Sequence, residues 1–514
     1  MRVFLMHHDR DFELHNGLAS NAAELAQDLA LDTLFEAMAA GDPFLLEVAK
    51  SSVLASLVER EAIDYRQSVL RDCMAQPAVV RELYGITVEA IEKEKRVWGW
   101  MSARYPEGTL HRASDVLRIF IERFHKIRHL VDEQGSEFRS QGFKRLFDML
   151  RAELSDEYLG AVEAHLGRLE FPSGIYMSAG LGDGCKGADY ILLKTPEVKQ
   201  GWLERIQSWA GSVKGNGMEF VYEVDSRDEA GLRALSNLRV EGIGRIAAAV
   251  AQSTDHILSF FRVLRLELGF YIGCLNLRDR LAHKQEPFCF PELLAMTRPM
   301  LECRSLYDVC LSLTIGERTV GNDISGADKA LAVITGANRG GKSTFLRSVG
   351  LAQLMMQCGM FVPAQSFRAN LCEGIFTHFK REEDTGMKSG KLDEELARMS
   401  AIIDRITPHS VVLFNESFAS TNEREGSQIA RQIVSALLEM GIKVFYVTHL
   451  FDLADGLYRA RMESALFLRA ERLSDGQRTF RLLAGEPLPT SFGEDLYERI
   501  FDEPQAAAAT NSQS

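Results

Sequence analysis

The sequence predicts a multidomain protein in which a mainly α-helical region with a small β insertion precedes an α/β domain built around a phosphate-binding loop. Three observations support this prediction. The chain has 514 residues, which is too long for one ordinary hydrophobic core. Apolar residues recur at helical spacing through the N-terminal part. A complete glycine-rich loop then follows the apolar run Leu331–Thr335.

The N-terminal part divides into two helical stretches and an insertion. From about Leu18 to Glu170, apolar residues repeat every three or four positions, as in an amphipathic helix. Between about Phe171 and Lys194, two short strand-like runs surround a glycine-rich turn, which predicts a β-hairpin. Few helix breakers interrupt Glu229 to Ala282. We therefore expect one or two long helices to return the chain past the hairpin.

Beyond Pro299 the pattern changes to alternating strands and helices. The strand candidates are Leu331–Thr335, Val411–Phe414 and Lys443–Thr448, and amphipathic helical patterns separate them. Gly441 stands where a helix C-cap glycine belongs. The pattern predicts a mostly parallel sheet with flanking helices.

We predict three segments from these patterns. Residues 1–300 form the helical region, residues 301–503 form the α/β domain, and residues 504–514 form a disordered tail that has nothing to bury.

The phosphate-binding loop is the pattern G-x-x-x-x-G-K-S at residues 336–343. Its backbone N–H groups can surround a phosphate chain, Lys342 can reach the β- and γ-phosphates, and the Ser343 hydroxyl can join a magnesium shell. A helix that starts near Ser343 adds its positive dipole end. The loop predicts a nucleotide-binding protein that uses magnesium, but the loop alone does not distinguish a kinase, a GTPase or a motor. The nucleotide-contacting residues are predicted to be Gly336, Ala337, Asn338, Arg339, Gly340, Gly341, Lys342, Ser343 and Thr344.

Two later strand ends supply the other catalytic candidates. Residues 411–416 form an apolar strand that ends in polar residues, so Asn415 can approach magnesium through water together with Ser343. Glu416 is the candidate for polarising the attacking water, and His449 can sense the γ-phosphate. The structural alternatives are an ordinary exposed glutamate just past a strand and a structural strand-end histidine.

Composition limits the classes of partner. The chain has 59 Lys and Arg against 72 Asp and Glu, which gives a net charge of −13. This charge argues against a surface that binds nucleic acid everywhere, but it is compatible with a local basic groove. The eight cysteines include no C-x-x-C pair, which suits a reducing cytoplasm. No apolar run reaches the about 18 residues of a membrane span. We expect a cytoplasmic protein without membrane contact.

The α/β domain resembles the ATPase domain of the MutS family of DNA mismatch-repair proteins. The family's T-G-P-N-M-G-G-K-S-T is similar to residues 335–344, its D-E-x-x-x-G-T-S-T-x-x-G to residues 415–426, and its T-T-H to residues 447–449. The family's signature S-T-F-x-x-E is similar to residues 389–394. The resemblance implies an ABC-type ATPase domain after a helical core and lever region.

The resemblance also implies a homodimer. In such ATPases the signature serine begins a helix and completes the ATP site of the opposite subunit, so Ser389 would act in trans. Taken alone, Ser389 and Gly390 could form just a turn and an N-cap, with acidic residues in the favoured first turn. Both interpretations can hold together.

Three positions depart from the family pattern. Asn415 stands in place of the aspartate near magnesium, which predicts weaker metal binding or slower turnover. Arg339 replaces a methionine and either adds positive charge beside the phosphates or points to solvent. The segment Thr319–Asp323 lacks the family's aromatic residue, so we assign no adenine-stacking residue.

The family's mismatch-reading device is not expected in this sequence. Phe120-Ile121-Glu122 matches the letters of the Phe-x-Glu wedge, but Phe120 lies on the apolar stripe of a predicted helix and should be core. We expect neither the N-terminal wedge domain nor a C-terminal Smr nuclease domain. A reduced clamp is expected at about residues 171–225. Its basic residues could touch DNA phosphates or form a solvated surface; they are Lys186, Lys194, Lys199, Arg205 and Lys214.

The leading hypothesis is a homodimeric MutS-like ATPase whose lever helices embrace DNA in repair or recombination. Its expected target is double-stranded or branched DNA rather than a mispaired base, a repair protein is a further expected partner, and the protein would be nucleoid-associated if it binds DNA. The alternative is a nucleotide-gated protein-interaction module that does not act on DNA. A transport ABC subunit is a weaker third option.

Overall fold

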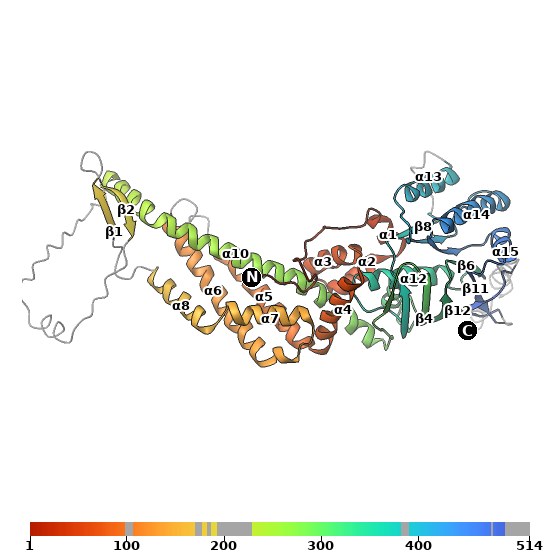
Figure 1. Ribbon diagram of the computed structural model, residues 1–514, viewed down its shortest axis with the longest axis horizontal. Coiled ribbons are helices and arrows are strands. Elements are labelled where there is room, and N and C mark those ends of the chain that lie inside the picture. Colours follow the sequence, from red (N-terminus) through yellow and green to blue (C-terminus); the bar gives the residue numbers. More distant parts are fainter. Residues whose placement is uncertain are drawn as a thin grey trace, which may run out of the picture. The chain divides into compact units, whose positions relative to one another are not determined.

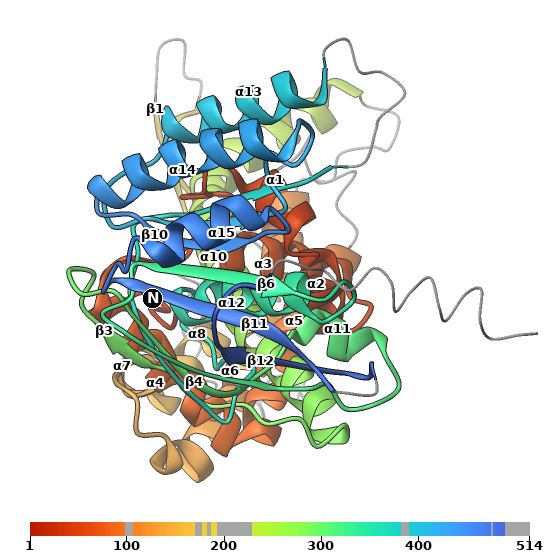
Figure 2. The same cartoon turned by 90° about the vertical axis from the view of Figure 1, so that its right-hand side faces the viewer.

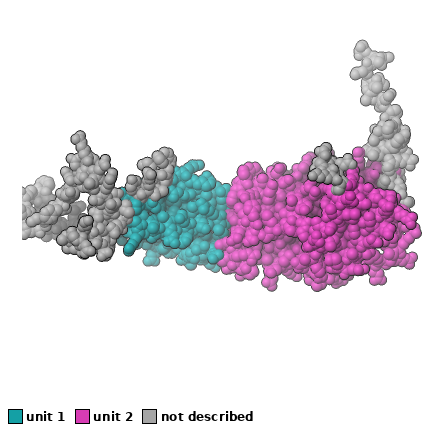
Figure 3. Space-filling view, turned by 90° about the horizontal axis from the view of Figure 1, so that it is seen from above, with its two compact units in different colours: residues 1–3, 82–136, 146–265 teal, residues 4–81, 137–145, 266–514 magenta. Residues whose placement is uncertain are grey.

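The computed structural model describes residues 1–97, 106–169, 177–181, 187–192, 229–381, 390–473 and 476–488. The chain divides into two compact units (Figure 3). Unit 1 combines residues 1–3, 82–136 and 146–265, and unit 2 combines residues 4–81, 137–145 and 266–514. Among the described residues, no helix is both long and apolar enough to cross a membrane.

Helices make up the described N-terminal region, as the apolar spacing predicted (Figure 1). Their starts carry ordinary helix signals: at the third helix, Pro43 is the first residue and the Asp42 side chain accepts a hydrogen bond of 2.8 Å from Phe44 N. The helices are α1 (Ala22–Asp28), α2 (Leu31–Ala39), α3 (Pro43–Leu54), α4 (Arg60–Ala75), α5 (Pro77–Arg96), α6 (Pro106–Gln134), α7 (Gln141–Glu153), α8 (Asp156–Arg168) and α10 (Glu229–His283).

Unit 1 has an aromatic core between α6 and α10. The ring of Phe261 lies 5.2 Å from that of Phe120 and 5.0 Å from that of Phe124, measured between centroids. Phe120 is fully buried, so its interpretation as a core residue is confirmed. The strands β1 (Met177–Leu181) and β2 (Gly187–Leu192) pair antiparallel within the segment predicted as a hairpin. The basic residues proposed for the clamp, Lys186 to Lys214, lie outside the described residues.

Unit 2 contains a six-stranded sheet whose central strands are parallel, as predicted. Its strand order is β12-β11-β6-β10-β9-β8, and only β12 runs antiparallel to its neighbour among the described strands. The strands are β6 (Leu331–Gly336), β8 (Ile375–Phe379), β9 (Val411–Asn415), β10 (Lys443–Val447), β11 (Ala465–Arg472) and β12 (Arg478–Ala484).

Helices cover both faces of this sheet (Figure 2). α13 (Lys391–Ile403), α14 (Glu423–Glu439) and α15 (Phe451–Arg459) pack on one face, where their apolar side chains join those of the strands in one buried cluster. α12 (Lys342–Gln357) packs on the other face. Gly441 follows α14 with φ +74°, which confirms its expected C-cap position.

A second sheet of four strands was not predicted. Its order is β3-β7-β4-β5, and all its pairs except β3 with β7 are antiparallel. Lys443, at the start of β10, is buried and donates hydrogen bonds of 2.6 Å to Met300 O and 3.0 Å to Asn370 Oδ1, which ties the two sheets together. The elements are β3 (Glu292–Leu294), β4 (Met300–Leu306), α11 (Val309–Thr314), β5 (Asn322–Ala327) and β7 (Ser366–Asn370).

A buried carboxylate holds the N-terminal segment of unit 2. Glu267 on α10 is fully buried and accepts backbone N–H bonds from Phe12 at 2.7 Å and Met6 at 3.2 Å. Burial raises the pKa of Glu267 to about 7, although these backbone hydrogen bonds oppose the shift. The segment from Phe4 to α1 is therefore an integral part of unit 2.

Side chains close the free edge of the six-stranded sheet. β8 is an edge strand, so one row of its backbone groups has no partner strand. Asn21 Nδ2, just before α1, donates to Ile375 O at 2.8 Å, and Arg398 on α13 donates to Phe379 O at 2.8 Å. These two side chains satisfy carbonyl groups at both ends of β8.

Candidate functional site

The candidate site lies where three neighbouring parallel strands end. β6, β10 and β9 are adjacent, so the loops that follow Gly336, Val447 and Asn415 meet at one edge of the sheet. Glu416 N donates to Val447 O at 2.9 Å, which fixes one of these loops against the next strand. Along the chain the order is β6, β9, β10, whereas in the sheet β10 lies between β6 and β9. The predicted residues therefore lie at neighbouring strand ends.

The glycines of the loop after β6 meet steric demands. Gly336 has φ +108°, and a Cβ there would lie 2.8 Å from Ala470 N. Gly341 has φ +88° and precedes the first residue of α12. A Cβ at Gly340 would lie 2.8 Å from Ala337 O. A side chain at these positions would displace the loop backbone, so the glycines of the sequence pattern match the backbone geometry.

Lys342 folds back onto this loop. Its Nζ donates to Gly336 O at 3.0 Å and to Ala337 O at 2.9 Å, and the side chain is buried. Burial is the main reason that the pKa of Lys342 is lowered to about 8. Glu416 opposes this shift and Arg478 adds to it. The ammonium group is therefore held beside the space that the loop encloses.

Ser343 and Asn415 lie in direct contact. Ser343 Oγ donates to Asn415 Oδ1 at 2.8 Å, although the two residues are on α12 and β9. A hydroxyl and an amide oxygen, with the Glu416 carboxylate on the next residue, form an oxygen donor set of the kind Mg²⁺ prefers. The residues therefore fit magnesium, but neither Ser343 nor Asn415 contributes a negative charge.

Glu416 and His449 form the polar pair predicted at the strand ends. His449 Nε2 lies 2.8 Å from Glu416 Oε1, and both side chains are partly exposed. This hydrogen bond holds the pKa of Glu416 below its usual value, with burial acting in the opposite direction. Glu416 has φ +55°, a strained conformation for a residue with a side chain. An ionised carboxylate is thus fixed beside the phosphate-binding loop.

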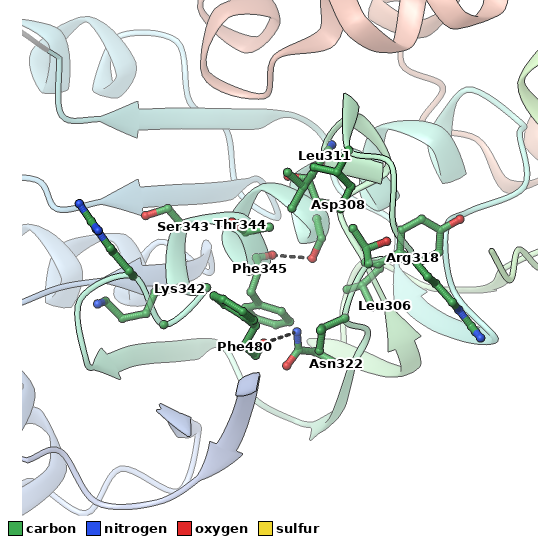
Figure 4. A pocket seen from close by; sticks show the side chains of 18 of the residues that line it. Leu306, Asp308, Leu311, Arg318, Asn322, Lys342, Ser343, Thr344, Phe345 and Phe480 are labelled. Atoms are coloured by element: carbon green, nitrogen blue, oxygen red, sulfur yellow. Dashed lines mark hydrogen bonds between the residues drawn. The ribbon is translucent and has the colours of Figure 1, made fainter. Parts of the chain in front are cut away.

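Lys342, Ser343 and Glu416 line a cleft of about 480 Å³ (Figure 4). Asn415 and His449 do not line this cleft but are hydrogen-bonded to Ser343 and Glu416. The strand-end side of the cleft consists of residues 338–344 and Glu416. Its far wall, as we call it, consists of lining residues between Leu306 and Asn322 together with Phe480. The volume lies within the range of small-ligand pockets, and apolar and polar groups both line it.

The far wall contains an aromatic residue that sequence reasoning missed. Phe480 on β12 is 50% exposed, has φ +59°, and lies against Gly341 of the loop. The buried Asn322 fixes it, because Asn322 Nδ2 donates to Phe480 O at 3.4 Å and its Oδ1 accepts from Leu482 N at 2.7 Å. No local sequence signal marks Phe480, since its position depends on how β12 folds back onto the sheet.

The remaining predicted residues have different placements. Arg339 lines the cleft, is exposed, and has φ +59°. Thr344 also lines the cleft, and Arg478, which sequence reasoning did not select, donates to Asn338 O at 2.7 Å. Ser389 lies outside the described residues. The structure therefore brings together the predicted strand-end and loop residues and leaves Ser389 as a prediction.

Comparison with protein families gives two matches along the chain. The family model described as MutS2 N-terminal domain matches residues 58–284, and the one described as MutS domain V matches residues 332–495. The first spans described helices of both units, and the second contains the phosphate-binding loop, Asn415, Glu416 and His449.

Individual relatives agree with these matches. The chain is 26% identical over 267 residues to the DNA mismatch repair protein MutS of Leptospira interrogans, covering 48% of this chain and 30% of that protein. It is 30% identical over 262 residues to Endonuclease MutS2 of Lacticaseibacillus casei, covering 50% of this chain and 32% of the relative. A probable DNA mismatch repair protein Msh6 of Drosophila melanogaster is 32% identical over 176 residues, which cover 34% of this chain and 15% of the relative.

The aligned parts therefore span a third or less of the length of these relatives. The two family matches fall in the same order along the chain as the helical region and the α/β region of the fold. The chain belongs to the MutS family.

Proposed function

We propose that this protein binds and hydrolyses ATP in the cleft at the strand ends of the six-stranded sheet. One observation carries the proposal: the phosphate-binding loop, the Ser343–Asn415 contact and the Glu416–His449 pair converge on that cleft. Binding the phosphates, holding magnesium and polarising water are separate chemical tasks, and these residues are of the types that the tasks need. Phosphoryl transfer depends mainly on positioning and on electrostatic stabilisation of the phosphates.

Each residue has a distinct task in this proposal. The ammonium group of Lys342 leaves the carbonyls of Gly336 and Ala337 and contacts the phosphate chain. Ser343, and Asn415 through water, would hold magnesium, which would neutralise charge on the phosphates. Glu416, kept ionised by His449, orients and polarises the attacking water, and His449 senses the γ-phosphate. Phe480 offers a ring face for the base.

The proposal extends to a homodimer that acts on DNA. Ser389 of each subunit would complete the partner's ATP site, and the nucleotide state would control lever helices that engage DNA. The names of the relatives support a role in DNA repair or recombination. Double-stranded or branched DNA is the proposed target, a repair protein is a further proposed partner, and the cytoplasm is the proposed location, with nucleoid association if DNA is bound.

ATP hydrolysis measured with a panel of DNA structures tests this proposal. The panel contains fully paired duplex, mismatched duplex and branched DNA, each at stated salt, because phosphate contacts make affinity strongly salt-dependent. We expect hydrolysis without DNA and a different rate with the preferred DNA structure. Lys342→Ala should lose nucleotide binding, and Glu416→Gln should bind ATP without hydrolysing it.

Two outcomes would each contradict a different part of the proposal. If the wild-type protein neither binds nor hydrolyses ATP, the nucleotide proposal is wrong. If ATP is hydrolysed but no DNA structure binds with or without nucleotide, the DNA part is wrong. That second outcome would favour the alternative function, a nucleotide-gated module that engages proteins, with which the net charge of −13 is also compatible.

A further inference from the structure

α13 is bonded to the loop that carries Glu416 through a buried histidine. His378 on β8 is fully buried, with its Nδ1 2.7 Å from Ser417 Oγ and its Nε2 2.9 Å from Glu395 O. Its ring also stacks on Phe418 with centroids 5.2 Å apart. One imidazole therefore touches the residue after Glu416 at one nitrogen and the backbone of α13 at the other.

The proton positions on His378 follow from its partners. A carbonyl oxygen only accepts, so Nε2 carries the proton that is donated to Glu395 O. Burial lowers the pKa of His378 to about 4, which keeps the ring neutral and makes Nδ1 an acceptor for the Ser417 hydroxyl. Ser417 Oγ also lies 2.6 Å from His378 O, so its single proton is shared between the two acceptors.

Glu395 adds a second bond between α13 and the same loop. Its Oε1 accepts from Ser420 Oγ at 3.1 Å, and its Oε2 is buried without a hydrogen-bond partner in the described part of the chain. The residue is 7% exposed, and burial raises its pKa. Burial of a carboxylate is costly to stability, and this carboxylate meets Ser420 of the loop that follows Glu416, which points to a role beyond packing.

The loop itself has little freedom to relax. Glu416 and Phe418 both have positive φ values, +55° and +61°. A Cβ at Gly426 would lie 2.3 Å from Phe418 O, and Tyr446 donates its hydroxyl proton to Ser417 O at 2.9 Å. A shift of α13 is therefore passed to the loop as a displacement rather than absorbed by local rearrangement.

We propose that His378 and Glu395 are positioning residues that link α13 to Glu416, so that the position of α13 sets the orientation of the catalytic carboxylate. The link rests on the proposed function, because it takes Glu416 as the residue that orients water. Neither residue lines the cleft in which we propose that ATP binds. Their effect is on the rate of hydrolysis and not on ATP affinity.

Variants of Glu395 test the link by separating kcat from KM. Glu395→Ala removes the acceptor for Ser420. We expect kcat to fall by about tenfold with KM changed less than about twofold, because the lost hydrogen bond positions Glu416 and does not hold the nucleotide. Glu395→Gln keeps an acceptor oxygen and should restore most of kcat. Glu439→Gln makes the same chemical change at an exposed position of α14 and should leave kcat unchanged.

Hydrogen exchange gives a second readout that does not depend on hydrolysis. With ADP or a non-hydrolysable ATP analogue, we expect exchange in residues 391–403 to change in the wild-type protein and to change much less in Glu395→Ala. Thermal unfolding of each variant identifies a simple loss of stability. Ser420→Ala, which removes the donor to Glu395, should act in the same direction if Glu395→Ala fails to fold.

The outcomes separate this inference from the proposed function. If nucleotide binds but exchange in α13 and the kcat of the Glu395 variants stay unchanged, the link is wrong and the ATPase proposal stands. A parallel loss of kcat, affinity and thermal stability would show a merely structural role and would also overturn the link. If the wild-type protein binds no nucleotide, the proposed function and this inference both fail.

Discussion

The two sides of the cleft are built in different ways. The strand-end side consists mainly of the continuous segment 338–344, which Glu416 joins from the end of β9. Lys342 in that segment is hydrogen-bonded to carbonyls only five and six positions away. The far wall depends on Asn322 holding Phe480 from 158 positions away. The proposed phosphate contacts therefore depend mainly on residues close together in sequence, whereas the surface proposed for a base depends on tertiary contacts. The difference suggests that chemistry and base binding can be disrupted separately.

The largest expected effect lies on the strand-end side. Glu416→Gln removes the ionised group that polarises water, and we expect kcat to fall by about 10²- to 10⁴-fold, the usual contribution of a general base. ATP affinity should stay close to that of the wild type, because Glu416 does not hold the phosphate chain. Single-turnover hydrolysis together with a binding titration checks both. An equal loss of affinity would show that the two sides of the cleft are not separable.

Phe480→Ala tests the far wall, where we expect a loss of affinity rather than a loss of kcat. Loss of one aromatic stacking surface costs about 1–3 kcal/mol, so we expect the affinity for ATP and ADP to fall by about 5- to 150-fold. The kcat at saturating ATP should change little. Leu483→Ala is the matched control, because Leu483 is exposed on the same strand but does not line the cleft. A lower kcat with unchanged affinity would contradict the assignment of Phe480 to the base.

The pH dependence of affinity should report on Lys342. Its pKa is about 8 when its neighbours are carbonyl groups, and bound phosphates favour the charged form, so binding takes up a proton. Affinity should be constant below this pKa and fall as pH rises above it, by about tenfold between about pH 7 and about pH 9. Calorimetry in buffers of different ionisation enthalpy measures the proton uptake. Lys342→Arg should bind more weakly with a flat pH profile, and a rise in wild-type affinity with pH would refute the assignment.

The smallest expected effect concerns magnesium. Asn415→Asp places a carboxylate beside Ser343, and we expect magnesium to support hydrolysis at a concentration lower by about three- to tenfold, since one added charge strengthens an exposed site modestly. Titration of the ATPase with magnesium measures the change. Asn422→Asp adds the same charge at an exposed N-cap and serves as the control. Equal magnesium curves for Asn415→Asp and the wild type would show that Asn415 does not face the metal.

Local sequence patterns predicted those elements that a short run of residues specifies. The strands β6, β9 and β10, the start of α12 and the buried Phe120 follow from short runs of residue types and their spacing. Each needs only a few neighbours along the chain to be specified. The same holds for the glycines that the loop after β6 requires.

Contacts between distant segments could not be anticipated in this way. The four-stranded sheet includes β3, which has three residues and pairs with β7 far along the chain. Phe480 becomes part of the cleft only because β12 lies at the sheet edge near Asn322. His378 likewise acquires its partners from the loop after β9 and from α13. Single-sequence patterns do not encode which distant segments meet, since many pairings satisfy the same alternation of apolar and polar residues.

The capped edge of β8 affects how the protein behaves when it is partly unfolded. Asn21 and Arg398 satisfy carbonyl groups that would otherwise be open to a strand from another molecule. If α1 detaches before the sheet melts, Ile375 O loses its partner while the apolar strand remains intact. Self-association by strand addition would then begin at β8, so the N-terminal helix protects the protein against aggregation as well as completing its fold.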